Sequence, residues 1–435
     1  MMEILSLGEK IKRRRKELNM TLKDLAGDRI TPGQISLVES GKSNPSMDLL
    51  EYLARELNTS IEYLMESEET QAQKICTYFE NIAESYIISG SLNQSEKYIE
   101  EAIYYSEKYS LQYEKAKNLY LKGTIYTARK EYPIAQQLLL SANVVFIKNN
   151  KYEEIIKTFI NLGKITISMK SYHASSSYLQ QAENVYKENN IGNDFLLGQI
   201  YYYTACINFK LENMEEAINY SYLANEKFRQ IDNREEYAKS LFLLAEEYNK
   251  KGDINNAIKY SKKTLNVYRK LEDMINTAKI ENNLGKLFGE FNNIEESFIH
   301  LNKAKELRMK CKDGKIVDTL INICENYIKL KDVINSRKVL EEIRDKIDEK
   351  NSKSLVYYYM MKFRINMIEC NKNEAENTLI DALNFAKKMN YTKEAADISI
   401  KLGKFYEDSK MDKEAAKYLS EGVEIFKKIG ILKEY

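Results

Sequence analysis

The sequence predicts an all-α protein with two different parts, a small domain of short helices followed by a long solenoid of helix pairs. Three observations support this prediction. Small residues recur at a spacing of about 40 residues along most of the chain, which is typical of stacked helical repeats. Residues 1–65 do not share this repeat. Only 3 of the 435 residues are proline, so long uninterrupted helices are permitted.

Capping signals divide residues 1–65 into five short helices. The first is expected over about 6–18. Thr21, with Asp24 three residues later, forms a capping box that starts the second helix, and Gly27 ends it. The second helix is therefore predicted from its end signals, and the first from its apolar face of Leu7, Ile11 and Leu18.

The third helix has the most complete start signal. Thr31 supplies an N-cap, Pro32 fills the first helical position and Gln34 stands at the third. Gly41 ends the helix. Two interpretations of Gln34 stay open, because it either completes a capping box with Thr31 or contacts a base of DNA. Two short helices joined by a tight, glycine-bearing turn are the helix-turn-helix arrangement.

The fourth and fifth helices complete this small domain. Ser46 caps the fourth helix, and Ser60 starts the fifth, which ends near Met65. The fourth helix is predicted to bury Leu49, Leu50, Leu53 and Leu57. The domain thus has enough apolar side chains for a core of its own.

Five blocks of residues 4–65 resemble the XRE, or lambda-repressor-like, DNA-binding domain in order and spacing. They are IKRRRKELNMT, LKDLA, ISLVESGKSNPS, LLEYLARELN and SIEYLM. The resemblance implies a buried ion pair between Arg15 and Glu39. It implies phosphate contacts from Lys42, Ser43 and Asn44, and groove-facing positions at Thr31, Gln34, Ser36 and Leu37. The sequence departs from the family at Leu22, where a phosphate-binding glutamine is usual, and in a shorter turn before Thr31.

The basic residues of the first helix have two interpretations. Lys10, Lys12, Arg13, Arg14, Arg15 and Lys16 either form a DNA-facing run or the solvated side of an amphipathic helix. Residues 1–65 carry ten basic and ten acidic side chains, so the domain is neutral as a whole. DNA binding would then depend on local basic positions and on two domains per site.

The repeat itself is defined by its small residues. They are Ser95, Ala135, Ser175, Ala217, Ala257, Ser297, Ser336, Ala375 and Ala415. Twelve residues before each lies a second, usually small residue: Ala83, Gly123, Gly163, Ala205, Ala245, Gly285, Cys324, Phe363 and Gly403. Such pairs let two helices approach closely. The pattern resembles tetratricopeptide repeats stretched from about 34 to about 40 residues, and it implies a right-handed solenoid of about nine helix pairs over 73–435, after a polar linker at 66–72.

Asparagine recurs at positions that face the concave groove of such a solenoid. The residue two before the small Gly, Ala or Cys is asparagine in four repeats, at Asn81, Asn161, Asn283 and Asn322, and the last three are predicted to bind. An amide both donates and accepts, so it suits the backbone of an extended peptide. The predicted peptide-binding residues are Asn161, Lys164, Tyr203, Asn282, Asn283, Lys286, Asn322, Glu325 and Arg364. The alternative is that a chain rich in asparagine places some there by chance.

Composition points away from enzymes and membranes. The net charge is +1, so no bulk attraction to nucleic acid or membranes is expected. The 5 Cys and 2 His are scattered, and no phosphate loop or nucleophile motif occurs, so we expect no catalytic site, metal or cofactor. No apolar run is long enough to cross a membrane and the start does not resemble a signal peptide, which predicts a cytoplasmic protein.

The two parts together resemble the peptide-responsive regulators of Gram-positive bacteria, the family of Rap, Rgg, NprR, PlcR and PrgX, with a length closest to NprR-like members. The resemblance implies a quorum-sensing transcription regulator that binds specific double-stranded DNA as a homodimer. A short imported signalling peptide in the groove would switch it. Two alternatives remain: a Rap-like protein that binds a response regulator and promotes its dephosphorylation, or a DNA-bound scaffold without a peptide. The Tyr357–Met361 cluster is either a dimer interface or ordinary core.

Overall fold

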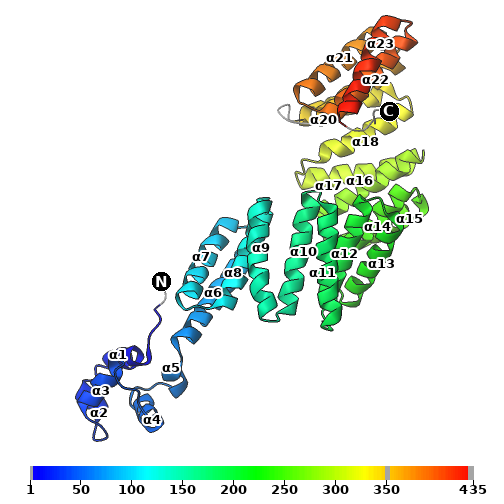
Figure 1. The fold of residues 1–435 in the computed structure, drawn as a ribbon. Helices are drawn as coiled ribbons and strands as arrows, with labels where there is room; N and C mark the ends of the chain where they lie inside the picture. Colours follow the sequence, from blue (N-terminus) through cyan, green and yellow to red (C-terminus); the bar gives the residue numbers. More distant parts are fainter. Residues whose placement is uncertain (1–2, 348–352, 430–435) are drawn as a thin grey trace. The chain divides into compact units, whose positions relative to one another are not determined.

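The computed structural model describes residues 3–347 and 353–429, and all regular secondary structure in these ranges is helical. Figure 1 labels the helices α1 to α23 in chain order. The chain divides into two compact units, residues 1–227 and 228–435, with the boundary inside α13. The all-α class, the helix-turn-helix domain and the array of helix pairs predicted from the sequence are all confirmed.

Five helices form the N-terminal domain of the first unit. They are α1 (Leu7–Glu17), α2 (Leu22–Ala26), α3 (Pro32–Glu39), α4 (Met47–Glu56) and α5 (Ile61–Met65). Helices α2 to α5 begin at the caps expected from the sequence, and α1 begins in the same way at Ser6. The side chains of Ser6, Thr21, Thr31, Ser46 and Ser60 all accept a hydrogen bond from a backbone N–H in the first turn. Their core includes Ile11, Leu25, Ile35, Leu53 and Leu64.

The array begins earlier than expected. Helix α6 (Glu68–Ile88) starts inside the predicted linker 66–72. The Ser67 side chain accepts a hydrogen bond from Thr70 N, and the first turn carries Glu68 and Glu69, whose charges favour a helix N-terminus. The boundaries drawn from the sequence are therefore corrected here, since only residues 66 and 67 separate α5 from the array.

Nine helix pairs follow, and we call the first helix of each pair A and the second B. In the first unit they are α6 with α7 (Leu92–Lys108), α8 (Gln112–Ala128) with α9 (Tyr132–Lys148), α10 (Tyr152–Ser168) with α11 (Tyr172–Glu188), and α12 (Asp194–Lys210) with α13 (Met214–Gln230). Thereafter come α14 (Arg234–Lys251) with α15 (Ile254–Lys270), α16 (Met274–Glu290) with α17 (Ile294–Lys310), α18 (Ile316–Lys329) with α19 (Val333–Lys346), α20 (Ser354–Ile368) with α21 (Lys372–Lys388), and α22 (Thr392–Asp408) with α23 (Asp412–Lys428).

The small residues do what their spacing predicts. A Cβ added at Gly285 would lie 2.5 Å from Leu301 Cγ, and one at Gly163 would lie 3.1 Å from Leu179 Cδ2. In the third pair the hydroxyl of Ser175 donates to Gly163 O at 2.8 Å. Helices A and B thus touch at the position where the sequence repeats a small residue. The leucine four residues after the small residue of helix B fills this contact, a part of the repeat that we had not identified.

The turns of the array share one backbone feature. In every described turn between consecutive array helices, one residue adopts a positive φ; examples are Lys130 (65°), Asn150 (52°) and Lys170 (61°). A residue in the left-handed region closes a helix C-terminus and redirects the chain within a few residues. Most of these residues are not glycine, so the positions of glycine in the sequence do not predict where most of these turns lie.

Candidate functional site

Helix α3 presents one face to the domain core and the other to solvent. Ile35 and Val38 are buried, whereas Ser36 and Leu37 are exposed. Two of the four predicted groove-facing positions therefore lie on a free surface of α3, as recognition of a DNA groove requires. A leucine exposed beside a serine offers an apolar contact for a thymine methyl group.

Thr31 and Gln34, the other two groove-facing positions, form the capping box. The Gln34 amide oxygen accepts hydrogen bonds from Thr31 N at 2.9 Å and from the Thr31 hydroxyl at 3.2 Å. Gln34 N in turn donates to the Thr31 hydroxyl oxygen at 3.3 Å. The first of the two interpretations of Gln34 is therefore observed. Contact with a base would depend on the exposed amide nitrogen of Gln34.

The ion pair between α1 and α3 is confirmed. Arg15 Nε and Nη2 donate to the two carboxylate oxygens of Glu39 at 2.6 and 2.9 Å. The side chains are only 12% and 7% exposed. The hydrogen bonds that Arg15 donates to Glu39 raise the pKa of Arg15 above its ordinary value. Arg15 also donates to Met20 O at 2.8 Å, so one guanidinium joins α1, the turn before α2, and α3.

The loop after α3 carries the three predicted phosphate-binding residues close to that helix. Lys42, Ser43 and Asn44 are all exposed. The backbone N–H groups of Lys42 and Ser43 donate to Leu37 O at 2.9 and 3.3 Å. These bonds fold the loop back onto the end of α3, so its side chains and those of Ser36 and Leu37 come from one surface of the domain.

Two important residues of this domain were not identified from the sequence. A Cβ at Gly8 would lie 2.5 Å from the carbonyl oxygens of both Val38 and Glu39, so only glycine lets α1 and α3 approach this closely. Lys10 is almost fully buried, and its ammonium donates to Tyr63 O at 2.8 Å and Glu66 O at 2.7 Å.

The basic run of the first helix is therefore not one surface. Burial lowers the pKa of Lys10, and Arg15 is held in its ion pair. Arg14 donates to Leu57 O at 3.0 Å. Lys12 and Lys16 are exposed.

Three of the predicted peptide-binding residues lie in the first unit. Asn161 Nδ2 donates to the hydroxyl of Tyr120 at 2.8 Å, which links A helices α10 and α8. Burial raises the pKa of Tyr120 to about 12. The ammonium of Lys164 lies 4.8 Å from the centre of the Tyr203 ring, which links α10 to the next A helix, α12. The structure thus brings Lys164 and Tyr203 together.

The other six lie in the second unit, on A helices α16, α18 and α20. Asn322 Nδ2 donates to Asn282 Oδ1 at 3.1 Å. Glu325, one turn after Asn322, lies 3.6 Å from Arg364. Asn283 is half-buried, and Lys286 is exposed, 3.8 Å from Glu290. The contacts join Asn282 with Asn322 and Glu325 with Arg364.

The two asparagine contacts are the same contact in different repeats. In each, the residue two before the small residue donates its amide nitrogen to the residue three before the small residue of the preceding A helix. The amide nitrogen is used internally and fixes the side chain, so the amide oxygen has a set direction. Such oxygens are ordered acceptors for the N–H groups of an extended chain.

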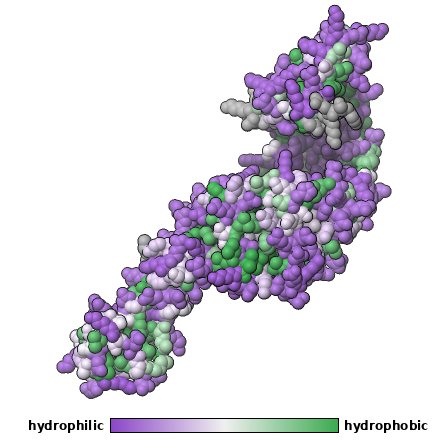
Figure 2. Space-filling view, in the orientation of Figure 1, coloured by the Kyte–Doolittle hydropathy of each residue, from purple (hydrophilic) through white to green (hydrophobic). Residues whose placement is uncertain are grey.

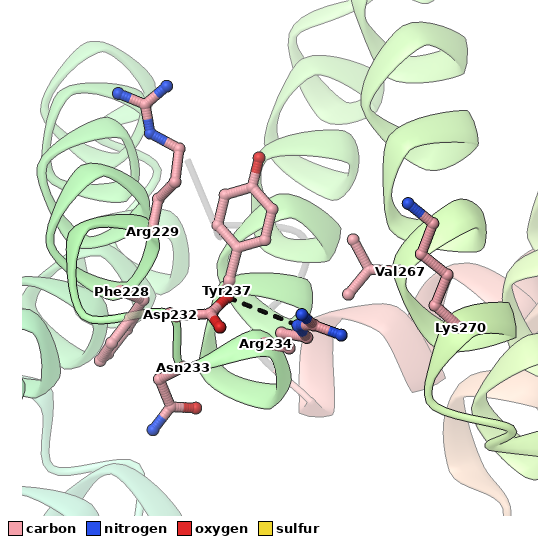
Figure 3. A pocket seen from close by; sticks show the side chains of 8 residues that line it. All are labelled: Phe228, Arg229, Asp232, Asn233, Arg234, Tyr237, Val267 and Lys270. Atoms are coloured by element: carbon pink, nitrogen blue, oxygen red, sulfur yellow. Dashed lines mark hydrogen bonds and ion pairs between the residues drawn. The ribbon is translucent and has the colours of Figure 1, made fainter.

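A cavity of about 250 Å³ in the second unit lies elsewhere. Its lining residues are Phe228, Arg229, Asp232, Asn233, Arg234, Tyr237, Val267 and Lys270. Figure 3 shows Arg229 and Lys270 on either side of the Tyr237 ring, and Arg234 toward Asp232, 3.4 Å away. None of the predicted peptide-binding residues lines this cavity.

A buried charged cluster was also not predicted from the sequence. Glu281 accepts hydrogen bonds from Arg269 Nη2 and shares one with His300 Nδ1, both at 2.6 Å. Burial acts to raise the pKa of Glu281, but the hydrogen bonds with His300 and Arg269 outweigh it, and this pKa lies below its ordinary value. The His300 ring stacks on Phe288. The cluster holds α15, α16 and α17 together.

The Tyr357–Met361 cluster belongs mainly to the core. Tyr358 and Met361 are buried, and Tyr359 and Met360 pack against buried neighbours. Only Tyr357 is exposed. Of the two interpretations of this cluster, the structure supports ordinary core. In the described ranges there is no group of His, Cys, Asp and Glu arranged to hold a metal, and no helix with the length and apolarity of a membrane span.

Comparisons with known proteins agree with both parts of the fold. Residues 11–64 match the helix-turn-helix family model, and residues 238–271, within α14 and α15, match the tetratricopeptide repeat model. A comparison with curated protein sequences found no significant match. The predicted combination of an XRE-type domain with tetratricopeptide repeats is therefore confirmed.

Three solved structures are similar in fold. The apo form of RapI has a TM-score of 0.65 at 15% identity and covers 81% of this chain and 98% of its own. The apo form of the quorum sensor NprR from B. thuringiensis has a TM-score of 0.59 at 14% identity, with 83% and 100% covered. A Rap protein complexed with Competence and Sporulation Factor has a TM-score of 0.50 at 11% identity, with 83% and 99% covered.

Proposed function

We propose that this protein is a quorum-sensing transcription regulator of the cytoplasm, which binds specific DNA as a homodimer and is switched by a short imported peptide. Residues 1–65 are the DNA-binding domain, and the array from α6 onward binds the peptide and dimerises. The observation that carries the proposal is the surface of α3, where Ser36 and Leu37 are exposed while the Arg15–Glu39 pair fixes the helix from behind.

DNA binding by this surface divides into two kinds of contact. Lys42, Ser43 and Asn44 reach phosphates, which positions the domain without reading sequence. Ser36, Leu37 and the amide nitrogen of Gln34 face base edges, which gives specificity. A domain with equal numbers of acidic and basic residues binds weakly alone, so two copies on a two-fold site are required for useful affinity.

Peptide binding is proposed on the A helices. In the second unit, α18 presents Asn322, which the buried Asn282 of α16 fixes through their hydrogen bond, and Glu325 of α18 lies beside Arg364 of α20. The fixed amide oxygens accept from peptide N–H groups, and Arg364 or Lys286 binds a carboxylate. An extended peptide spans at most about 3.3–3.6 Å per residue, so fewer than about ten residues cross these three helices. In the first unit, Asn161, Lys164 and Tyr203 form the equivalent surface.

The test uses the full chain in gel shifts on duplexes selected from a random library. Lys42→Ala should weaken binding to all sequences by a similar factor, whereas Gln34→Ala should change preference at one position per half-site. Lys108→Ala, at an exposed residue of α7 outside the DNA-binding domain, is the matched control and should leave binding nearly unchanged. Binding without any sequence preference at physiological salt would contradict the proposal.

The peptide is tested in the same assay. Synthetic peptides from reading frames beside the gene are added, and one of them should create or abolish the specific shift. Asn322→Ala should lower affinity for that peptide by about tenfold, because it leaves Asn282 and a peptide group unpaired. If a response regulator, and not a peptide, alters the shift, the Rap-like alternative gains support. If neither does, the chain acts as a DNA-bound scaffold.

A further inference from the structure

One helix of the array differs from all its counterparts. Helix α9 has 17 residues, and its only charged residue is Lys148 at the last position, although 30% of the chain is charged. Four aliphatic side chains on α9 are nevertheless exposed. Ile134, exposed by 44%, lies in the first turn, and the other three lie further along the helix: Leu140 by 43%, Val144 by 67% and Ile147 by 53%. The last three follow one another at helical spacing and so form a single stripe. We call these three residues the α9 stripe.

The repeat supplies its own control for this observation. The stripe occupies the positions five, nine and twelve residues after the small residue Ala135 of helix B. In α11 the same positions hold Gln180, Asn184 and Lys187, all exposed. Each of the other B helices has at least one charged residue at these three positions. These three positions therefore face solvent in the array, and only α9 has an aliphatic residue at all three of them.

The flanks of the stripe are also without charge. Gln137 and Ser141 are exposed beside it, and Pro133 precedes it on the same side of the helix. In the view of Figure 2, hydrophobic surface gathers over the segment that Figure 1 labels α9 and α10. Contiguous apolar surface with a polar, uncharged border is typical of a protein–protein contact and not of a free surface.

We propose that the α9 stripe is the centre of the contact between two copies of this chain. Residues beside a two-fold axis meet their own copies, so a charge at the centre of such a contact faces a like charge. A helix free of charge over the stripe is the one B helix that can lie against its own copy without this repulsion. The inference rests on the dimer of the proposed function and gives it a surface.

The position of the stripe suits a DNA-binding dimer. Helix α9 belongs to the same compact unit as α3. Contact at the stripe would therefore join the first unit of one copy to the first unit of the other, and each of these carries an α3. Stable dimers bury about 1,200–2,000 Å² in total, more than three side chains supply. The stripe is thus the apolar centre of a larger interface, and Gln137 and Ser141 belong to its polar border.

The experiment replaces the stripe by the residues of the neighbouring repeat. The full-length variant Leu140→Gln/Val144→Asn/Ile147→Lys carries at these positions what α11 carries, so the helix is expected to keep its fold. Sedimentation analysis should show a dimer for the parent chain and a dissociation constant raised by more than about tenfold for the variant. The thermal midpoint of the variant at low protein concentration should be unchanged.

The matched control removes more exposed aliphatic side chains from scattered places. Ile88→Gln/Ile275→Asn/Ile334→Lys takes away three isoleucines that are 87%, 60% and 71% exposed on three separate helices. This variant should dimerise as the parent does. A dimer that survives the stripe variant would overturn the α9 assignment and leave the proposed dimer standing. A parent chain that stays monomeric would overturn both, while DNA binding is still read separately in the gel shift.

A single substitution covers the case in which the triple variant does not fold. Val144→Cys, in a Cys370→Ser background because Cys370 is exposed, should form a disulfide-linked dimer under mild oxidation. Ile334→Cys in the same background should not. Absence of the Val144→Cys cross-link would overturn the inference.

Discussion

The first five helices and the array after them are both all-α, but they are held together in different ways. In the N-terminal domain the decisive contacts occur once and join residues far apart in sequence, as in the pair Arg15–Glu39 or the bonds from Lys10 to Tyr63 O and Glu66 O. In the array one contact recurs between residues 12 apart, as in Ser95 to Ala83 O and Ser175 to Gly163 O.

This difference bears on how each part responds to change. A contact made once has no substitute, so its loss affects the whole small domain. A contact that recurs in successive pairs is shared by neighbours, and its loss stays local because each pair packs mainly on adjacent pairs. The helix-turn-helix domain should therefore be more sensitive to single substitutions than the array is.

The largest effect is expected from breaking the ion pair between α1 and α3. Arg15→Met leaves the carboxylate of Glu39 buried without its partner, which should cost about 3–5 kcal/mol of unfolding free energy in the domain. The double variant Arg15→Met/Glu39→Met should recover much of this loss, because it removes both charges. Denaturant unfolding followed by hydrogen exchange of α1–α5 measures both. Equal stability of the single variant and the parent would contradict the idea that the N-terminal domain depends on contacts made only once.

A smaller but still clear loss is expected at Gly8. In Gly8→Ala the new Cβ meets two backbone carbonyl oxygens at 2.5 Å, and backbone cannot rotate away, so α1 and α3 must separate. We expect a loss of about 1–3 kcal/mol and weaker DNA binding. Gly33→Ala is the control, since its Cβ would find only the Thr31 hydroxyl oxygen at 3.9 Å. It should be neutral or slightly stabilising in thermal unfolding.

In the array, the loss should scale with the closeness of helices A and B. Gly285→Ala places a Cβ 2.5 Å from Leu301 Cγ, whereas Gly163→Ala places one 3.1 Å from Leu179 Cδ2. We expect about 1–2 kcal/mol for the first and less for the second, because a side chain yields more readily than backbone and alanine favours the helix. Hydrogen exchange should be faster in α16 and α17 alone. Exchange accelerated throughout the array would show that the contact is not local.

The smallest expected effect is a pH dependence from the buried cluster at Glu281. Its pKa in the fold lies below the ordinary 4.5. The ionised carboxylate thus adds stability that is complete above about pH 4.5 and is lost as the pH falls through the folded pKa. Glu281→Gln should flatten the fall of the thermal midpoint between about pH 6 and pH 3 relative to the parent. Parallel curves for the two proteins would count against a stabilising role of this carboxylate.

Local signals in the sequence determined much of the fold. The caps at Thr21, Thr31, Ser46 and Ser60 predicted the starts of four helices, and all four are observed. The recurring small residues predicted nine helix pairs, because each marks the place where helix A and helix B of one pair touch. Capping and A–B packing join residues at most about a dozen positions apart, so both can be predicted from local sequence.

Tertiary structure decided what depends on residues distant in the chain. Nothing in the local sequence distinguishes Lys10, which is buried, from Lys12, which is exposed, because the carbonyls that receive Lys10 belong to Tyr63 and Glu66. The same holds for Gly8 against α3 and for Glu281 between Arg269 and His300. A buried charge or a close backbone approach is set by the partner that surrounds it, and the partner's place follows only once the helices have packed.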